Sequence, residues 1–182
     1  MLTYIQAVDM KLLQWIAGFA KNDFFDFLMP IVTKIGNKGM IWIVIALVLM
    51  ATKKYRRHGI VLAGALLIGV ILGDGFLKKI FQRPRPFEEI EGMKLLIKAP
   101  TTYSFPSGHT TASFGAFWAL HKKFSDKRVT AGVFLLAAFI SFSRMYLFVH
   151  YPTDIAAGVI LGIASASLAL KAEKAFESKK VK

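Results

Sequence analysis

The sequence of 182 residues contains no cysteine, which excludes disulfide bonds and metal sites built on thiolates. Acidic residues are also scarce: 11 Asp and Glu stand against 24 Lys and Arg, so the formal net charge is +13. Charged residues of both signs make up only 19%, below the roughly 25% of soluble domains. Hydrophobic residues reach 55%. Because the basic residues lie in short clusters between apolar runs, we expect a membrane protein with no nucleic-acid partner.

The N-terminal region does not have the pattern of a cleavable signal peptide. Asp9, Lys11 and Lys21 interrupt residues 1–22, whose apolar positions recur at helical spacing. Pro30 and Lys34 likewise interrupt the next apolar stretch. We therefore predict amphipathic or half-inserted helices over residues 1–35.

Five apolar stretches follow, and their lengths of 14 to 21 residues compare with the roughly 20 that a full span needs. They are Gly39–Thr52, Ile60–Leu77, Ser107–Leu120, Val129–Val149 and Ile155–Leu170. The pattern predicts an all-α, polytopic transmembrane bundle of five to six spans. We expect residues 1–182 to form one domain, with a bundle over 39–170 and a basic tail over 171–182.

The loops between these stretches predict the orientation in the membrane. Three segments that alternate along the chain hold 13 of the 24 basic residues: Lys53–Arg57, Lys122–Arg128 and Lys171–Lys182. The positive-inside rule places all three segments, and thus the C-terminus, in the cytoplasm of a cell-membrane protein. Residues 81–106 and 149–153 then face the outside or the periplasm.

Chemically distinctive residues gather at the outer ends of the spans. They are Asp74, Lys78, Arg83, Arg85, Ser107, Gly108, His109, Ser143, Arg144, His150 and Asp154. An arginine within an apolar run costs a few kcal/mol, and such residues usually face a polar cavity. For Arg144 alone, a functional role and a structural ion pair with Asp74 or Asp154 are about equally good interpretations.

These residue types together favour phosphate chemistry. Lys78, Arg85 and Arg144 supply fixed positive charges, and guanidinium groups bind phosphate oxygens in pairs. Ser107 and Gly108 open an apolar helical run, where backbone N–H groups and the helix dipole attract an anion. An ordinary capped helix start explains Ser107 and Gly108 equally well but leaves the adjacent histidine unexplained.

Two histidines have the surroundings that phosphoryl transfer requires. His150 precedes Asp154 by four residues, and a carboxylate on one imidazole nitrogen leaves the other free to attack phosphorus. His109 would protonate the leaving oxygen as a general acid. His58 and His121 lie in basic loops without an acidic partner, and we interpret both as solvated.

The complete pattern resembles the three-part signature of the type 2 phosphatidic acid phosphatase superfamily. The three parts are Lys78-x6-Arg85-Pro86, Pro106-Ser107-Gly108-His109 and Ser143-Arg144-x5-His150-x3-Asp154. The resemblance implies a helical core shared with vanadium haloperoxidases and a lipid phosphatase that needs neither metal nor cofactor. It also implies a phosphohistidine intermediate.

By position, the resemblance makes His150 the nucleophile, Asp154 its orienting partner and His109 the general acid. It makes Lys78, Arg85, Ser107, Gly108 and Arg144 the phosphate ligands. Asp74 and Arg83 lie outside the signature, and Ser143 fits helix packing as well as it fits catalysis.

The substrate is less defined than the chemistry. The chain resembles undecaprenyl diphosphate phosphatases and phosphatidylglycerophosphate phosphatases, and we favour undecaprenyl diphosphate. Phosphatidylglycerophosphate, phosphatidic acid and lipid A phosphates are alternatives. Residues 87–103 either form a lid or entry lip or lie on the lipid headgroups. A non-catalytic phosphate-binding membrane protein is the alternative of another class, although binding alone would not need the two histidines. Five spans argue against a haloperoxidase.

Overall fold

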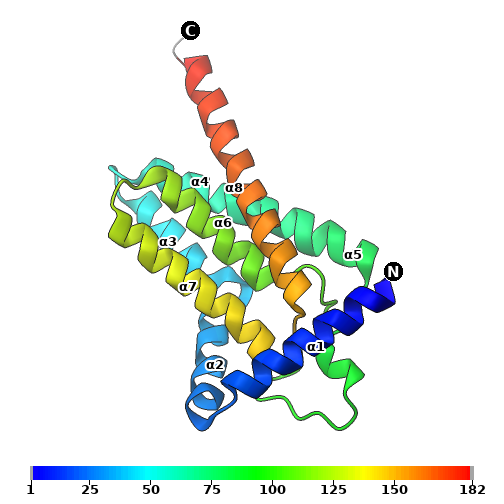
Figure 1. Cartoon of the computed structure of the whole chain (residues 1–182). Coiled ribbons are helices and arrows are strands. Elements are labelled where there is room, and N and C mark those ends of the chain that lie inside the picture. The colour runs from blue at the N-terminus through cyan, green and yellow to red at the C-terminus, as the bar shows by residue number, and fades with distance from the viewer. Residues whose placement is uncertain (1, 181–182) are drawn as a thin grey trace.

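Every regular element is helical in residues 2–180, the part of the chain that the computed structural model describes (Figure 1). The α-helices are α1 (Leu2–Ala20), α2 (Asp23–Ile35), α3 (Met40–Ala51), α4 (Arg56–Val70), α5 (Lys78–Phe81), α6 (Gly108–Lys123), α7 (Lys127–Tyr146) and α8 (Pro152–Lys180). Short 3₁₀ turns occur at Asn37–Gly39 and Pro86–Glu89, and a π-helical turn at Ile71–Leu77 joins α4 to α5. The predicted all-α class is confirmed.

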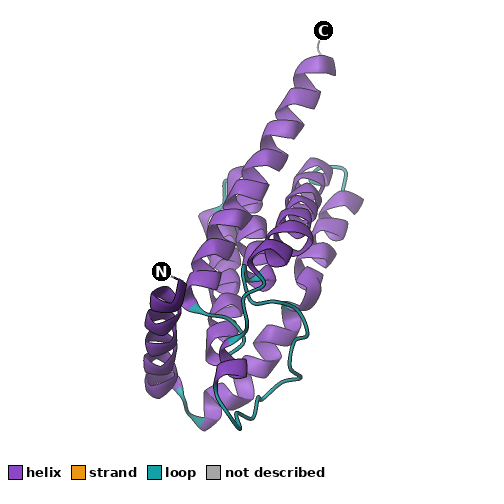
Figure 2. Ribbon diagram, turned by 90° about the vertical axis from the view of Figure 1, so that its right-hand side faces the viewer, coloured by secondary structure: helices purple, strands orange, loops and turns teal. Residues whose placement is uncertain are grey.

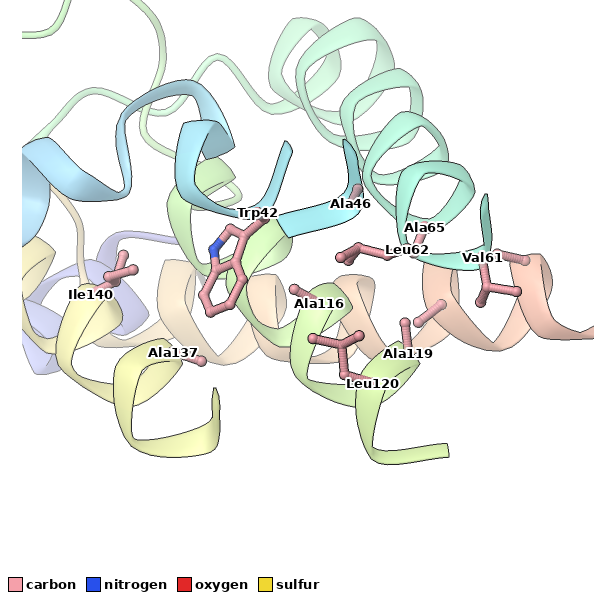
Figure 3. Packing of buried hydrophobic residues seen from close by; sticks show 12 residues of the cluster. Trp42, Ala46, Val61, Leu62, Ala65, Ala116, Ala119, Leu120, Ala137 and Ile140 are labelled. Carbon is pink, nitrogen blue, oxygen red and sulfur yellow. The ribbon is translucent and has the colours of Figure 1, made fainter. Parts of the chain in front are cut away.

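The bundle is organised around α6, which packs against α4, α7 and α8, while α3 covers α4. Its core combines large side chains with alanines, and Figure 3 shows the Trp42 indole directed toward the helices that carry Ala116 and Ala137. The indole Nε1 donates to Ser113 Oγ at 3.0 Å. Small residues allow close approach: a Cβ at Gly162 of α8 would lie 2.5 Å from the Thr111 backbone oxygen of α6.

Four segments of the described chain are long and apolar enough to cross a membrane. They are Asp23–Ala51, Arg56–Glu89, Lys127–Tyr146 and Pro152–Lys179. The sixteen residues of α6 fall short of that length, although α6 lies inside the bundle. The multi-pass helical architecture is therefore confirmed, whereas the expected count of five to six spans exceeds these four.

The first of these segments is broken where it meets the motif residues. Between α2 and α3, Lys38 and Gly39 have φ angles of 51° and 67°, which interrupt the helix. A Cβ on Gly36 would lie 2.7 Å from Ile140 and 3.1 Å from the His109 ring, so a larger residue would displace one of these side chains. Non-helical backbone at membrane depth is tolerated where it lines a cavity.

The three basic segments meet at one end of the bundle, as their alternation predicts. The rings of Tyr55 and Phe124 lie 5.4 Å apart, and Lys123 pairs with Glu173 of α8. Figures 1 and 2 show α1 and the long loop of residues 82–107 at the opposite end. The expected basic tail continues α8 as far as Lys180, and Lys182 lies outside the described residues.

Candidate active site

The three motif segments converge at the end of the bundle that faces away from the basic loops. Ser107 caps α6 as predicted, since its Oγ accepts from the Thr110 backbone N–H. The Ser107 backbone N–H donates to the Asp154 carbonyl at 3.2 Å and so joins the start of α6 to the start of α8. Pro152 begins α8, as its fixed φ angle favours at a first helical position.

His150 and Asp154 form a buried pair. Nδ1 of His150 lies 3.5 Å from Asp154 Oδ2, and the Asp154 side chain is completely inaccessible to solvent. The same oxygen accepts from Ser104 Oγ at 2.5 Å and from the Tyr151 backbone N–H at 2.9 Å. The carboxylate is thus fixed behind the imidazole, as a tautomer-setting partner must be.

The surroundings of His150 favour a neutral imidazole. Burial lowers the pKa of His150 well below its ordinary value of 6.5, and the positive charges of Arg85, Arg144 and Lys78 act in the same direction. A neutral ring with a proton on Nδ1 carries its lone pair on Nε2. That nitrogen faces the basic residues of the site.

Arg85 is held rigidly beside the free nitrogen of His150. Its Nη1 lies 3.3 Å from His150 Nε2 and donates to the Val149 carbonyl at 2.6 Å. Its Nε donates to the Thr102 carbonyl at 2.7 Å, and its Nη2 reaches Thr102 Oγ1 and the Tyr103 carbonyl at 3.2 Å each. The loop of residues 87–103 therefore anchors this guanidinium.

Arg144 lies in the last turn of α7 with 3% of its surface exposed. Its Nη1 donates to Thr33 Oγ1 of α2, while its buried Nε has no hydrogen-bond partner. Within residues 2–180 it pairs with neither Asp74 nor Asp154, so the structural ion pair left open by the sequence is not formed. A buried, unsatisfied guanidinium donor is the group that an incoming anion would satisfy.

A cavity of about 650 Å³ is lined by these groups together with apolar residues of α3 and α4. At one end it is lined by charged residues and by both histidines: Lys38, Asp74, Lys78, Arg85, His109, Arg144 and His150. At the other end it runs between α3 and α4 along apolar residues: Ile43, Ala46, Leu47, Met50, Ala63, Leu66, Leu67 and Val70. The cavity thus has a cationic end and a hydrocarbon-like end.

His109 lines this cavity from the first turn of α6. Its Nε2 lies 3.1 Å from Asn37 Oδ1, in the break between α2 and α3. Gly108 also lines the cavity, but Ser107 is fully buried and its hydroxyl bonds to Thr110. The structure therefore brings His109 and Gly108 to the cavity and leaves Ser107 beside it as a helix cap.

Lys78 carries a carboxylate partner. Its Nζ lies 2.7 Å from Asp74 Oδ1 one turn earlier and 3.5 Å from Thr102 Oγ1. Asp74 belongs to the π-helical turn, a feature frequent at functional sites. Ser143, by contrast, donates to the Ile140 carbonyl inside α7, which fits the packing interpretation.

Several residues of this site were missed in the sequence. Ser104 and Thr102 gave no signal, because nothing in the loop pattern separates them from other loop hydroxyls. Asp9 gave a weak one, as an acid on the otherwise apolar face of a helix. Arg83, which the signature omits, donates to Asp154 Oδ1 at 2.7 Å rather than lining the cavity.

Comparison with known proteins covers the three motif segments. The family model described as the PAP2 superfamily matches residues 58–177. An undecaprenyl-diphosphatase of Sulfolobus acidocaldarius is 34% identical over 155 residues, which are 85% of this chain and 73% of the relative. A lipid A 4'-phosphatase of Porphyromonas gingivalis is 30% identical over 61% of this chain and 50% of the relative. The crystal structure of Aquifex aeolicus LpxE aligns with a TM-score of 0.77 at 27% identity, covering 88% of this chain and 93% of that one.

Proposed function

Because this chain belongs to the PAP2 superfamily and is a membrane lipid phosphatase, we propose that it hydrolyses its substrate through a phosphohistidine on His150. The family resemblance drawn from the three-part motif is thereby confirmed, while the roles of single residues stay predictions. One observation carries the proposal: a single cavity joins a cationic, histidine-lined end to an apolar groove between α3 and α4. That combination suits a substrate with a phosphate head and a hydrocarbon chain.

In the first half-reaction, Lys78, Arg85 and Arg144 bind the oxygens of the phosphoryl group. His150 Nε2 donates its lone pair to phosphorus, the N–P bond forms, and the bond to the leaving oxygen breaks. His109 gives its proton to that oxygen. The Nδ1 proton of His150 stays toward Asp154, whose negative charge stabilises the ring as it becomes cationic.

In the second half-reaction, a water molecule replaces the leaving group. His109, now neutral, takes a proton from the water while the water oxygen bonds to phosphorus. The N–P bond breaks, and its electron pair returns to His150 Nε2. Inorganic phosphate leaves, and both histidines recover the protonation states with which they began.

We favour undecaprenyl diphosphate as the substrate, and Lys38 supports a diphosphate. This lysine lines the cavity next to Asn37, whose Oδ1 contacts the proposed general acid His109. Lys38 therefore adds a positive charge on the leaving-group side. A prenyl diphosphate releases an anionic phosphate, which such a charge stabilises, whereas a lipid monophosphate releases a neutral alcohol.

We also propose that the site opens toward the outer face of the cell membrane. The basic segments that the positive-inside rule assigns to the cytoplasm lie at the end of the bundle opposite the site. The cytoplasmic position of the C-terminus belongs to the same proposal. Cysteine accessibility tests it in intact cells: a cysteine at Lys94 should react with an impermeant reagent, and one at Ser178 should not.

Lipid A phosphate is a second candidate substrate because a relative named lipid A 4'-phosphatase shares 30% identity with this chain. Phosphatidylglycerophosphate and phosphatidic acid are further alternatives from the sequence. A non-catalytic phosphate-binding protein would keep Lys78, Arg85 and Arg144 but gain nothing from the buried His150–Asp154 pair.

The deciding experiment measures phosphate release by the detergent-purified protein from each of these lipids in the presence of EDTA. We expect undecaprenyl diphosphate to give the highest kcat/KM, His150→Ala to be inactive, and His121→Ala to retain wild-type activity. Loss of activity in EDTA would contradict the metal-independent mechanism. An active His150→Ala would exclude the proposed nucleophile, and a fully inactive wild-type protein would favour the binding protein.

A further inference from the structure

We infer that Asp9 of α1 is a positioning residue for phosphoryl transfer, acting through Arg83 on the carboxylate of Asp154. Neither Asp9 nor Arg83 belongs to the three-part motif, and α1 lies outside the residues matched by the family model. The inference rests on the proposed function, because it concerns the partner of the proposed nucleophile.

Asp9 is buried against the start of α8, with 3% of its surface exposed. Its Oδ2 accepts from Arg83 Nη2 at 2.6 Å and from the Thr153 hydroxyl, and its Oδ1 accepts from the Thr153 backbone N–H at 3.1 Å. A charged side chain directed inward from an apolar helix of a membrane protein is costly unless it is paired. The burial of Asp9 therefore depends on its ion pair with Arg83 and its hydrogen bonds from Thr153.

Arg83 connects Asp9 to the catalytic pair. While Nη2 binds Asp9, Nη1 donates to Asp154 Oδ1 at 2.7 Å and to Thr153 Oγ1 at 2.8 Å. The guanidinium also lies over the Tyr151 ring, 3.9 Å from its centroid. The Arg83 guanidinium is planar, is bound through both Nη atoms and lies against an aromatic ring on one face, so it has little rotational freedom.

This arrangement fixes the orientation of Asp154. Arg83 occupies Oδ1, while Ser104 and the Tyr151 backbone N–H occupy Oδ2, the oxygen that faces His150 Nδ1. Each oxygen thus has its own donors. Release of Arg83 would leave Oδ1 without its donor and remove one of the hydrogen bonds that fix the angle of the carboxylate toward the imidazole.

Charge gives Asp9 a second effect. Arg83 and Asp154 alone would form a neutral pair, and such a pair would do little to stabilise positive charge on His150. With Asp9 included, two carboxylates share one guanidinium, so the group keeps one net negative charge. That charge lies behind the ring, which becomes cationic when Nε2 bonds to phosphorus.

The test compares Asp9→Asn with Leu13→Ala in the detergent-purified protein. Asparagine keeps the size and an acceptor oxygen but removes the charge, whereas Leu13, fully buried one turn later on α1, tests docking of the helix alone. We expect Asp9→Asn to lower kcat by about 10- to 100-fold, as loss of outer partners does at metal sites. KM and the inhibition constant of inorganic phosphate should stay within about twofold, since the clamp residues are untouched. Leu13→Ala should lower Tm more than kcat.

Two results would overturn the inference. One is wild-type kcat in Asp9→Asn, and the other is a parallel fall of kcat and Tm in both variants, which would reduce Asp9 to a docking contact. His150→Ala, assayed beside them, separates this failure from that of the proposed function. If His150→Ala is inactive and Asp9→Asn is fully active, only the role of Asp9 is wrong. If His150→Ala is active, the nucleophile itself is wrong.

Discussion

Replacement of Gly162 by alanine should disrupt both the fold and the site, because α6 and α8 are in backbone contact at this point. The added Cβ would lie 2.5 Å from the Thr111 carbonyl oxygen and 2.7 Å from the Gly115 backbone nitrogen. Carbon contacts are optimal at about 3.5–4.0 Å, so the helices must separate by roughly 1 Å. Neither obstacle is a side chain that can rotate away.

The expected loss of stability in Gly162→Ala follows from that separation of the helices. A gap of about 0.5–1 Å removes a quarter to a half of the dispersion energy of each contact, and overpacking of a core typically costs about 1–3 kcal/mol. Since both clashing atoms belong to helix backbones, we expect about 3 kcal/mol, or more than a hundredfold in the unfolding equilibrium. The separation also reaches the site, because α6 carries His109 and α8 carries Asp154. A misplacement of about 1 Å can cost roughly 100-fold in rate.

Two other glycines provide matched controls. A Cβ at Gly64 would meet Ala169 at 3.4 Å, an ordinary contact, and one at Gly132 would meet nothing within 4 Å. Thermal unfolding in detergent and kcat/KM should therefore change strongly for Gly162→Ala and little for Gly64→Ala or Gly132→Ala. Equal stability of the three variants would refute the close-packing argument.

Two further predictions concern the proposed chemistry. His109→Ala should lower kcat/KM for farnesyl phosphate by about 100- to 10,000-fold, the usual contribution of general acid–base catalysis. It should lower kcat/KM for p-nitrophenyl phosphate much less, because that leaving group needs no proton, and His121→Ala should affect neither substrate. An equal loss with both phosphates would contradict the general-acid role. Lys38→Ala should lower kcat/KM for farnesyl diphosphate by about 10- to 100-fold, since a charged hydrogen bond contributes about 1.5–3 kcal/mol, and should leave farnesyl phosphate unchanged. The control variant is Lys34→Ala, because Lys34 is exposed and does not line the cavity. Equal losses of kcat/KM with both lipids in Lys38→Ala would exclude selective recognition of the second phosphate.

Local signals predicted most of the helices and the composition of the site. The predicted apolar stretches match α3, α6 and α7 to within three residues at each end, because span length and loop charge are local properties. The stretch Ile60–Leu77 covers most of α4 and the π-helical turn, whereas Ile155–Leu170 falls short of α8, which continues to Lys180. A capped helix start at Ser107, one of the two interpretations of that motif, is present in the structure. Four segments are long and apolar enough to cross a membrane, so the predicted five to six spans go beyond what helix length and composition show: α6 is too short by itself, and α2 with α3 counts as one broken segment.

The sequence did not distinguish the functions of neighbouring residues of the same type whose side chains point in different directions. Arg83 and Arg85 occupy successive Arg-Pro pairs, yet Arg83 reaches Asp154 and Arg85 reaches His150 Nε2. Ser107 belongs to the motif, yet its hydroxyl is used in capping, whereas Ser104 bonds to the Asp154 carboxylate. Side-chain direction depends on backbone turns in the loop of residues 82–107, which no periodic pattern encodes.

By itself, the sequence determined that this protein is a helical membrane phosphatase with two histidines and a cluster of cations at one end. Those features can be read from short segments of the sequence, because local hydrophobicity, loop charge and residue spacing determine them. Only the tertiary structure showed that Asp9 of α1 pairs with Arg83 behind the site and that Lys38, in the break between α2 and α3, lines the cavity. It also decided that an apolar groove leads to His150. These features arise between segments far apart in the chain, because burial and pairing depend on which helix faces meet.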